Sequence, residues 1–332
     1  MKSTKIIPLV SVVMPVLNCE NYVSMAINSI LSQTFHDFEF IIVDDGSTDG
    51  TSEIISSFSD ERIRFVRFES NRGFIEALEY GIKIAKGKWI ARMDGDDVCA
   101  PERLATELSY LEKFSDCIFI GTTYHHISPS GKIIEISKFP KDGYRFINKA
   151  DITFSKRKFA DSSVIYLREA AIEVGLLDKD IRNENPLWYK LLEKGKALEI
   201  YNALYVYRIV LASMTKKMAE DSSREVSRRV RVRYDPENAR FHSSWNKFSW
   251  PDEKTKRQNN IIFAMQICHI TGDLKEVLNI FSKILPKFWF DYRIFKIIIR
   301  GLFGIKSLNP FKIKKDSPYK EIHLDWYEKL IT

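Results

Sequence analysis

The chain has 332 residues, of which 45% are hydrophobic and 29% are charged. This balance is typical of a globular protein and argues against disorder throughout the chain, and the length allows two domains or one large α/β domain with an appendage. The charge is unevenly spread. Residues 216–332 contain 24 Lys and Arg against 14 Asp and Glu, whereas residues 1–215 contain 27 against 30. The basic part therefore indicates binding to nucleic acid, binding to an anionic membrane surface, or a need for solubility.

The four cysteines form no CxxC pair and have no histidine at ligand spacing. They favour reduced thiols in a cytoplasmic protein over a disulfide framework or a zinc site. The first eight residues lack the apolar core of a signal peptide, and no run of about 18 apolar residues predicts a transmembrane helix. We therefore expect a cytoplasmic protein.

The first part of the chain alternates short apolar runs with helical patterns. The apolar runs predict four strands, at residues 10–16, 38–43, 63–68 and 88–91, and a helix follows each of the first three. Such alternation is typical of βαβ units in a mostly parallel sheet. The carboxyl ends of these strands then meet at one edge, where open α/β sheets bind ligands. Four polar loops follow the strands, at residues 15–18, 44–49, 71–72 and 94–97.

The pattern becomes less regular after residue 100. Helices are predicted at 103–114, 168–174 and 186–194, and strands at 117–123, 133–139, 162–167, 197–200 and 204–209. From about residue 216 charged helical patterns dominate.

Three carboxylates, Asp94, Asp96 and Asp97, directly follow the fourth predicted strand. In an extended segment Asp94 and Asp96 project to the same side, where two like charges repel unless a cation lies between them. A hard divalent ion that carries a diphosphate fits such oxygen ligands. The cluster also fits an acidic turn that caps the helix starting near Pro101, and on its own it favours neither interpretation.

Taken together, the loops resemble the inverting glycosyltransferases of family 2, which have a GT-A fold. The matching segments are Val12–Asn18, Ser29–Thr34, Val43–Asp49, Asn71–Gly73, Met93–Asp97, Pro101 and Arg103-Leu104. Several motifs in the same order and spacing make a more specific signal than one glycine-rich loop.

The resemblance implies an α/β fold with a Rossmann-like, mostly parallel central sheet flanked by helices, followed by a C-terminal helical extension. It places a GT-A domain at residues 1–215, with a nucleotide-sugar-binding half at about 9–105 and an acceptor-binding half at 106–215. Residues 216–332 are then a basic, aromatic and mainly helical region.

The resemblance also implies a donor site at the carboxyl edge of the sheet. Pro15, Val16, Asn18 and Asp45 would flank the nucleobase, with Glu20 beside them, and Asn71 and Arg72 would contact base or phosphate. Asp94 would bind ribose, and Asp96 and Asp97 would bind Mn²⁺ or Mg²⁺ on the diphosphate. Arg208, in a Tyr-Arg pair after the last strand, would help hold the diphosphate or form a structural ion pair.

An inverting transfer also needs a base that takes the proton of the acceptor hydroxyl. The family usually places an Asp a few residues before a Leu-Trp on a helix. Aligned on Leu187-Trp188, that position falls on Glu184, which departs from the usual Asp. Asp161, in a loop that the family places near the acceptor, is a second candidate.

Residues 286–315 carry eight Lys and Arg against one acid, with aromatic residues between them. This pattern fits either an interfacial helix on an anionic membrane or a helical pair packed on the catalytic domain. The first interpretation predicts peripheral attachment to the inner face of the cell membrane. The tail matches no recognised nucleic-acid-binding module, so we expect no nucleic-acid partner.

These features predict a hexosyltransferase-class glycosyltransferase that uses a nucleotide-sugar, most simply a UDP-sugar. The expected acceptor is a glycan or lipid-linked oligosaccharide in surface polysaccharide synthesis. Two alternatives stay open: a synthase that glycosylates polyprenyl phosphate, and a non-catalytic nucleotide-sugar- or membrane-binding module.

Overall fold

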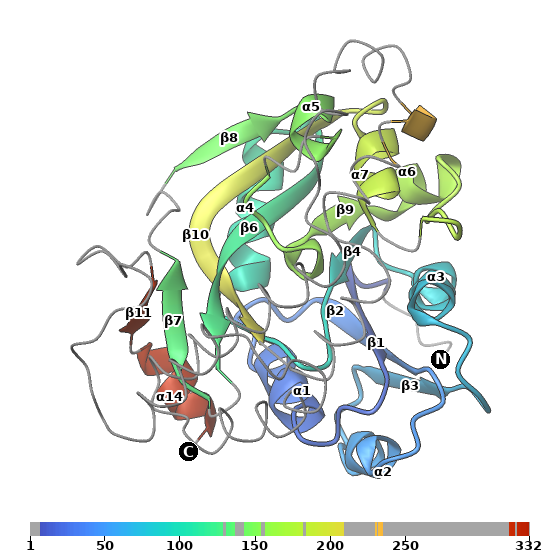
Figure 1. Ribbon diagram of the computed structural model, residues 1–332, viewed down its shortest axis with the longest axis vertical. Coiled ribbons are helices and arrows are strands. Elements are labelled where there is room, and N and C mark those ends of the chain that lie inside the picture. The colour runs from blue at the N-terminus through green and yellow to red at the C-terminus, as the bar shows by residue number, and fades with distance from the viewer. Residues whose placement is uncertain are drawn as a thin grey trace, which may run out of the picture.

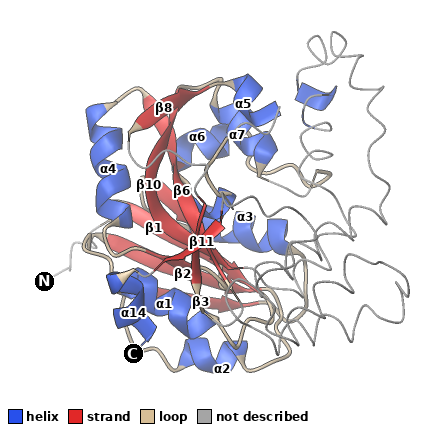
Figure 2. Ribbon diagram, turned by 60° about the vertical axis from the view of Figure 1, so that its left-hand side comes forward, coloured by secondary structure: helices blue, strands red, loops and turns tan. Residues whose placement is uncertain are grey.

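A computed structural model describes residues 7–128, 131–136, 143–153, 157–181, 184–208, 230, 232–234, 319–322 and 324–331 (Figure 1). Its centre is one mixed sheet covered by helices on both faces (Figure 2). No helix among these residues is long and apolar enough to cross a membrane. The predicted basic tail at 286–315, like most of the predicted C-terminal region, lies outside the described residues.

The first part of the chain forms the parallel half of the sheet. Its elements are β1 (Val10–Val16), α1 (Val23–Leu31), β2 (Phe38–Asp44), α2 (Thr51–Ser56), β3 (Ile63–Arg67), α3 (Phe74–Ile84) and β4 (Trp89–Arg92). The strands lie in the order β4-β1-β2-β3, and each neighbouring pair is parallel. Every residue of β1 is buried, as expected for a central strand with both faces covered. The predicted βαβ units are confirmed here.

The second part of the chain is a mixed α/β arrangement. Its elements are β5 (Val98–Cys99), α4 (Arg103–Lys113), β6 (Cys117–Ile127), β7 (Ile133–Ile136), β8 (Tyr144–Ile147), α5 (Lys149–Thr153), the 3₁₀ turn η1 (Asp161–Ser163), β9 (Ile165–Leu167), α6 (Arg168–Glu173), α7 (Asn185–Leu191) and β10 (Lys196–Arg208). β9 lies between β4 and β6, antiparallel to both, and joins the two halves of the sheet. β10 runs parallel to β6.

Two predicted element boundaries were wrong in this part. The predicted strands at 197–200 and 204–209 form one strand, β10, which bends through register shifts against β6 between Ile200 and Tyr205. The irregularity interrupts the alternation of apolar side chains along the strand, so the sequence pattern predicts two strands where there is one. The strand predicted from residue 162 begins only at Ile165, because the chain first makes the turn η1.

The hydrophobic core has two layers, one on each face of the sheet. One layer packs α1, α2 and α4 against side chains such as Val12 and Met14. The other packs α3, α6 and α7 against the alternate side chains, such as Val13 and Ile41. This division follows from the two-residue period of strands, which directs alternate side chains to opposite faces of the sheet.

The end of the chain returns to the sheet. β11 (Tyr319–Ile322) pairs antiparallel with β7, and α14 (Asp325–Ile331) lies beside α1 (Figure 1). Tyr327 of α14 is buried in a small cluster with Val98 and Val206. Val98 directly follows the acidic loop and Val206 precedes Arg208, so the chain's last helix supports the strands that carry predicted site residues. α14 is the part of the predicted C-terminal helical extension that the structure describes as a helix packed on the sheet.

Truncation of this buried tyrosine is expected to destabilise the fold. Tyr327→Ala should lower the free energy of unfolding by about 3 kcal/mol, because it removes a large buried ring and leaves a cavity. Urea unfolding measures this loss. The matched change Tyr144→Ala, at a tyrosine that is 40% exposed, should cost much less. Equal losses would show that α14 contributes little to the core.

Candidate active site

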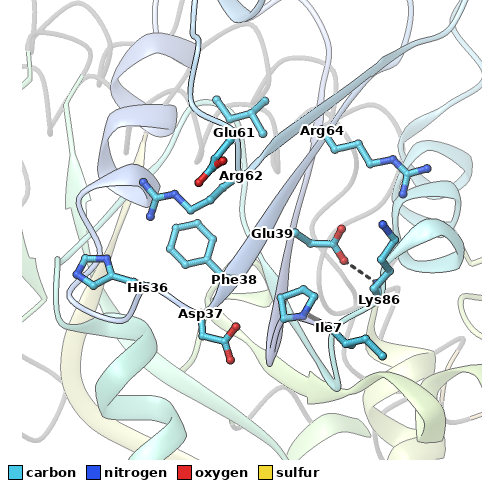
Figure 3. Close-up of a pocket in the computed structure, with 11 residues that line it drawn as sticks. Ile7, His36, Asp37, Phe38, Glu39, Glu61, Arg62, Arg64 and Lys86 are labelled. Carbon is cyan, nitrogen blue, oxygen red and sulfur yellow. Dashed lines mark hydrogen bonds between the residues drawn. The ribbon is translucent and has the colours of Figure 1, made fainter. Parts of the chain in front are cut away.

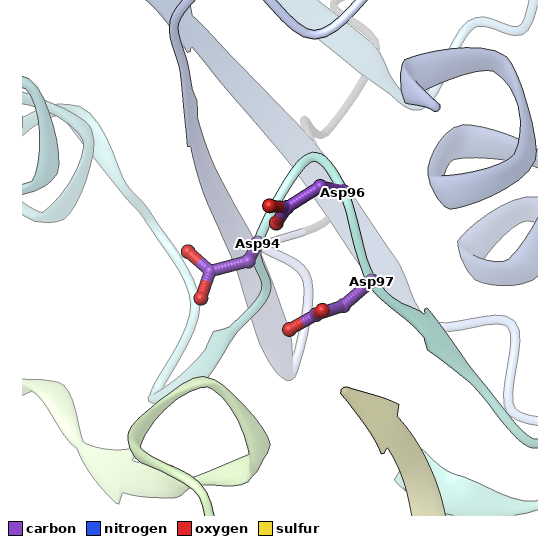
Figure 4. A group of neighbouring side chains, drawn as sticks. All are labelled: Asp94, Asp96 and Asp97. Atoms are coloured by element: carbon purple, nitrogen blue, oxygen red, sulfur yellow. The ribbon is translucent and has the colours of Figure 1, made fainter. Parts of the chain in front are cut away.

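The acidic cluster lies in a tight turn between β4 and β5 (Figure 4). Asp94, Asp96 and Asp97 each present a carboxylate oxygen, and these oxygens lie within 4.8 Å of one another. The Asp97 amide donates to the Asp94 carbonyl at 3.4 Å, so the segment turns instead of staying extended as expected. The turn therefore brings in Asp97 as a third acid beside the two that the strand pattern places together.

A glycine makes this turn possible. A Cβ on Gly95 would lie 2.6 Å from Val16 Cγ1, which is closer than a Cβ normally approaches, and would make a tight contact of 3.1 Å with Cys19 Sγ. Gly95 therefore lets the acidic turn pack directly against the loop that follows β1. The predicted donor residues Pro15 and Val16 are buried at the end of that strand.

Asp97 is the buried member of the cluster. Its Oδ1 accepts a hydrogen bond from the Arg208 amide at 2.7 Å and its Oδ2 accepts one from Ser162 Oγ at 3.3 Å. Burial raises the pKa of the Asp97 carboxyl well above its usual range, and the neighbouring charges of Asp96 and Asp94 raise it further. Three acids that repel in this way fit a hard divalent cation with oxygen ligands.

Arg92, which the sequence interpretation missed, links this cluster to the predicted base. Its Nη2 lies 2.8 Å from Asp94 Oδ1, and its Nε lies 3.1 Å from Glu184 Oε1. The side chain is almost fully buried, and the Phe74 ring lies 4.8 Å from its guanidinium. A basic residue at the end of a buried strand, two positions before the acids, was the available signal.

Glu184 lies at the N-terminus of α7 and is 4% exposed. Burial raises the pKa of its carboxyl to about 7; Arg92 opposes this shift, while Asp161 and Asp94 add to it. Among the described residues, Arg92 is the sole hydrogen-bond partner of this carboxylate. Arg92 thus orients the Glu184 carboxylate through Oε1.

Asp161, the second candidate base, is held by other side chains. It accepts hydrogen bonds from Trp188 Nε1 at 2.7 Å and from Arg157 Nη2 at 2.8 Å. Trp188 is on α7, so Asp161 fixes the helix that carries Glu184. This arrangement favours a supporting role for Asp161 beside Glu184.

The residues predicted around the nucleobase cap helices and join loops. Asp45 accepts hydrogen bonds from the amides of Arg72 and Gly73, at 2.7 and 2.9 Å, at the start of α3. Glu20 accepts one from the Gly50 amide at 2.7 Å at the start of α2, and Asn18 accepts one from the Thr48 amide at 2.8 Å. These bonds pair amides of the loops that lead into α2 and α3.

The same loops depend on a second glycine. Gly46 has φ of +77°, and a Cβ there would lie 2.6 Å from the Ser70 carbonyl carbon. It therefore brings the Asp44–Asp49 loop against the loop that carries Asn71 and Arg72, both of which are exposed. Arg72 lies over the Phe68 ring at 4.4 Å, at the rim of this edge.

Arg208 lies at the end of β10 and is 4% exposed. Its Nε donates to the Asp96 carbonyl at 2.7 Å, and its guanidinium lies 4.7 Å from the centre of the Tyr22 ring. Arg208 therefore fixes the backbone of the acidic turn, and its charge lies beside the acids.

The opposite edge of the sheet carries a separate hollow of about 460 Å³ (Figure 3). It lies where β2 and β3 begin, and its lining mixes acids and bases, including Glu39, Arg62 and Lys86. Two of its charged side chains have partners: Arg62 pairs with Asp60 at 2.7 Å, and Glu39 accepts a hydrogen bond from the Lys86 backbone amide at 2.6 Å. None of the predicted site residues lines this hollow.

Comparison with known proteins gives the family. A family model described as glycosyl transferase family 2 matches residues 11–175. An uncharacterised glycosyltransferase of Methanocaldococcus jannaschii is 31% identical over 208 residues, which cover 61% of this chain and 71% of that protein. The chain belongs to glycosyl transferase family 2. The resemblance found in the loops is thereby confirmed.

Two relatives from Bacillus subtilis are named as glycosyltransferases, and one of these names refers to teichuronic acid biosynthesis. The putative teichuronic acid biosynthesis glycosyltransferase TuaG of Bacillus subtilis is 29% identical over 63% of this chain and 82% of its own length. The putative glycosyltransferase EpsE of the same organism is 38% identical over 35% of this chain and 42% of its own length. In four of the curated relatives it matches, the chain spans between 21% and 42% of the relative's length.

Solved structures confirm the GT-A fold. Mannosyltransferase PcManGT from Pyrobaculum calidifontis, in complex with GDP-Man and Mn²⁺, matches with a TM-score of 0.56 and 14% identity over 91% of this chain and 89% of that one. S. aureus TarS 1-349 in complex with UDP-GlcNAc matches with a TM-score of 0.52 and 15% identity over 89% of this chain and 92% of that one. At such identity the likeness supports the fold alone.

Proposed function

We propose that this protein is a metal-dependent inverting glycosyltransferase that moves a sugar from a UDP-sugar to a hydroxyl of a glycan or lipid-linked oligosaccharide. The observation that carries the proposal is the continuous arrangement of Asp96, Asp97, Asp94, Arg92 and Glu184. In this arrangement, a cluster of three acids and a buried carboxyl with a pKa of about 7 lie on the two sides of one arginine, and the cluster would bind the cation.

The donor half of the reaction belongs to the acidic turn. Asp96 and Asp97 would hold Mn²⁺ or Mg²⁺, and Asp94 would bind the ribose. A bound divalent ion neutralises the charge that develops on the leaving nucleoside diphosphate. Arg208 fixes the Asp96 carbonyl, and in this proposal it keeps the turn in place while the charge changes. The lone pairs of Asp45 that the Arg72 and Gly73 amides leave open would accept the imide N–H of uracil.

The acceptor half belongs to Glu184. Its carboxylate would take the proton of the acceptor hydroxyl as that oxygen attacks the anomeric carbon, and the bond from this carbon to the diphosphate oxygen breaks. Attack from the side opposite the leaving group inverts the anomeric configuration. Glutamate reaches further than the aspartate usual in the family, which offsets the retracted, 4% exposed position of this side chain.

A ligand screen tests the donor. Among UDP-, GDP- and dTDP-sugars, each at the same concentration with Mn²⁺, the sugar that binds most tightly should raise the unfolding temperature most, because a ligand that binds only the folded state stabilises it. UDP-sugars should give the largest rise, and release of UDP should accompany it. A larger rise with GDP-sugars would overturn the nucleobase assignment, and binding without release of UDP would favour a non-catalytic module.

The acceptor and location belong to the same proposal. Relatives named for polysaccharide synthesis and the basic, aromatic composition of residues 286–315 support a lipid-linked acceptor at the inner face of the cell membrane. Co-sedimentation with vesicles tests this location. Binding should need anionic lipid and weaken with salt; equal binding to neutral vesicles, or none to either, would contradict it.

A further inference from the structure

We propose that Arg92 is a positioning residue that holds Glu184 in line with the donor turn through its paired contacts to Asp94 and Glu184. The inference rests on the proposed function and goes beyond it, since it gives a role to a residue that touches neither donor nor acceptor. Arg92 would act on the rate of transfer through Glu184.

The geometry of the arginine supports this role. Three of its nitrogens point to three different partners: Nε to Glu184, Nη2 to Asp94, and Nη1 to the Met93 carbonyl. A guanidinium is planar and offers its N–H groups in a fixed fork, so it sets the direction of each partner. A lysine ammonium keeps the charge but cannot define three directions in one plane.

The surroundings of Arg92 keep the fork from turning. The Phe74 ring lies 4.8 Å from the guanidinium on one side. The Arg92 backbone is held as well: its amide donates to the Val164 carbonyl at 2.9 Å, and its carbonyl accepts from Arg103 Nη2 at 3.0 Å. The arginine is therefore anchored in the sheet, while its two acids lie at the start of α7 and in the turn after β4.

Arg92 joins two acids from parts of the chain that have different proposed tasks, the donor turn and the base. Glu184 is 92 positions away in sequence, and Arg92 is its sole hydrogen-bond partner among the described residues. Without this bond, no hydrogen bond from the described residues would orient the Glu184 carboxylate. Small errors in the orientation of reacting groups cost large factors in rate.

Steady-state transfer with Arg92→Lys tests the inference. The variant should lower kcat about 100-fold, by the cost of a misplaced reacting group. In the Glu184→Gln background the same change should have no further effect on kcat, because residues that act as a unit are not additive. Arg145→Lys is the matched control, since Arg145 also joins two acids, Glu199 and Asp151, both at 2.9 Å. It should leave kcat unchanged.

A gentler variant keeps the test valid if Arg92→Lys does not fold. Phe74 is 39% exposed, so Phe74→Leu should fold; it removes the ring beside the guanidinium and should lower kcat about threefold, again with no effect in the Glu184→Gln background. Losses that multiply with Glu184→Gln, or wild-type kcat in both variants, would overturn the inference. Full turnover in Glu184→Gln itself would instead overturn the proposed function, and this inference with it.

Discussion

Asp96→Ala is expected to abolish sugar transfer and to leave the fold intact. The alanine removes one of the three carboxylates that surround the proposed cation, and the charge on the departing diphosphate would then be poorly neutralised. Asp96 is only partly buried, so its truncation opens no large cavity. UDP release and sugar transfer measure the loss, and thermal unfolding checks the fold.

The matched control for this change is Asp116→Ala. Asp116 is an exposed acid that pairs with Lys196 at 2.7 Å, and surface pairs of this kind contribute little. Transfer should stay at the wild-type rate in this variant. Undiminished turnover in Asp96→Ala would contradict the assignment of the acidic turn.

Glu184→Gln should lower kcat by roughly 100-fold or more, the usual contribution of a general base, with little change in UDP binding. Glutamine has the same shape, and its Oε1 can still accept the hydrogen bond from Arg92, but it cannot take a proton at neutral pH. Transfer kinetics and calorimetric titration with UDP separate the two effects. Equal losses in turnover and in UDP affinity would argue against a role as base.

The raised pKa of Glu184 also predicts how the rate depends on pH. The carboxyl must be ionised to accept a proton, so kcat should rise with pH through about 7 and fall below it. The residual activity of Glu184→Gln should not show this rise of kcat with pH. A rate that is flat between pH 5 and pH 8 would mean that another group is the base.

The same pKa has the opposite effect on stability. The carboxyl pKa rises from 4.5 to about 7 on folding, so between these values the folded state holds more protons than the unfolded state. The contribution of Glu184 to the free energy of unfolding is therefore full below about 4.5 and is lost as pH rises through 7. An uncharged glutamine avoids this loss, so Glu184→Gln should gain stability relative to the wild type as pH rises. Burial of this carboxyl thus lowers stability at neutral pH and above.

The parallel half of the fold and the acidic turn could be predicted because they depend on local pattern. The wholly apolar run at 10–16 predicts a central strand, and the acids at 94–97 follow a strand end. The position of a loop at the carboxyl edge then follows from the parallel direction of the strands in βαβ units. Glu184 was found through the resemblance to family 2, since nothing local separates it from other helix-terminal acids.

The rest of the site depends on contacts between distant segments. Arg92 joins residues that only the folded sheet brings together, and no spacing along the chain reports that contact. The bonds from Asp45 and Asn18 to loop amides are equally hidden, because a capping acid and a ligand-binding acid look alike in sequence. The return of β11 to β7 depends on a pairing across some 180 residues, which local propensity does not predict.

Metal-dependent release of UDP from a UDP-sugar is the most direct test of the central claim, because it needs the acidic turn, the nucleotide site and the leaving group together. The assay compares the purified protein with Mn²⁺, with EDTA, and with EDTA followed by excess Mn²⁺. We predict release of UDP with Mn²⁺, its loss with EDTA and its recovery when Mn²⁺ is restored. Release that continues unchanged in EDTA would contradict the account.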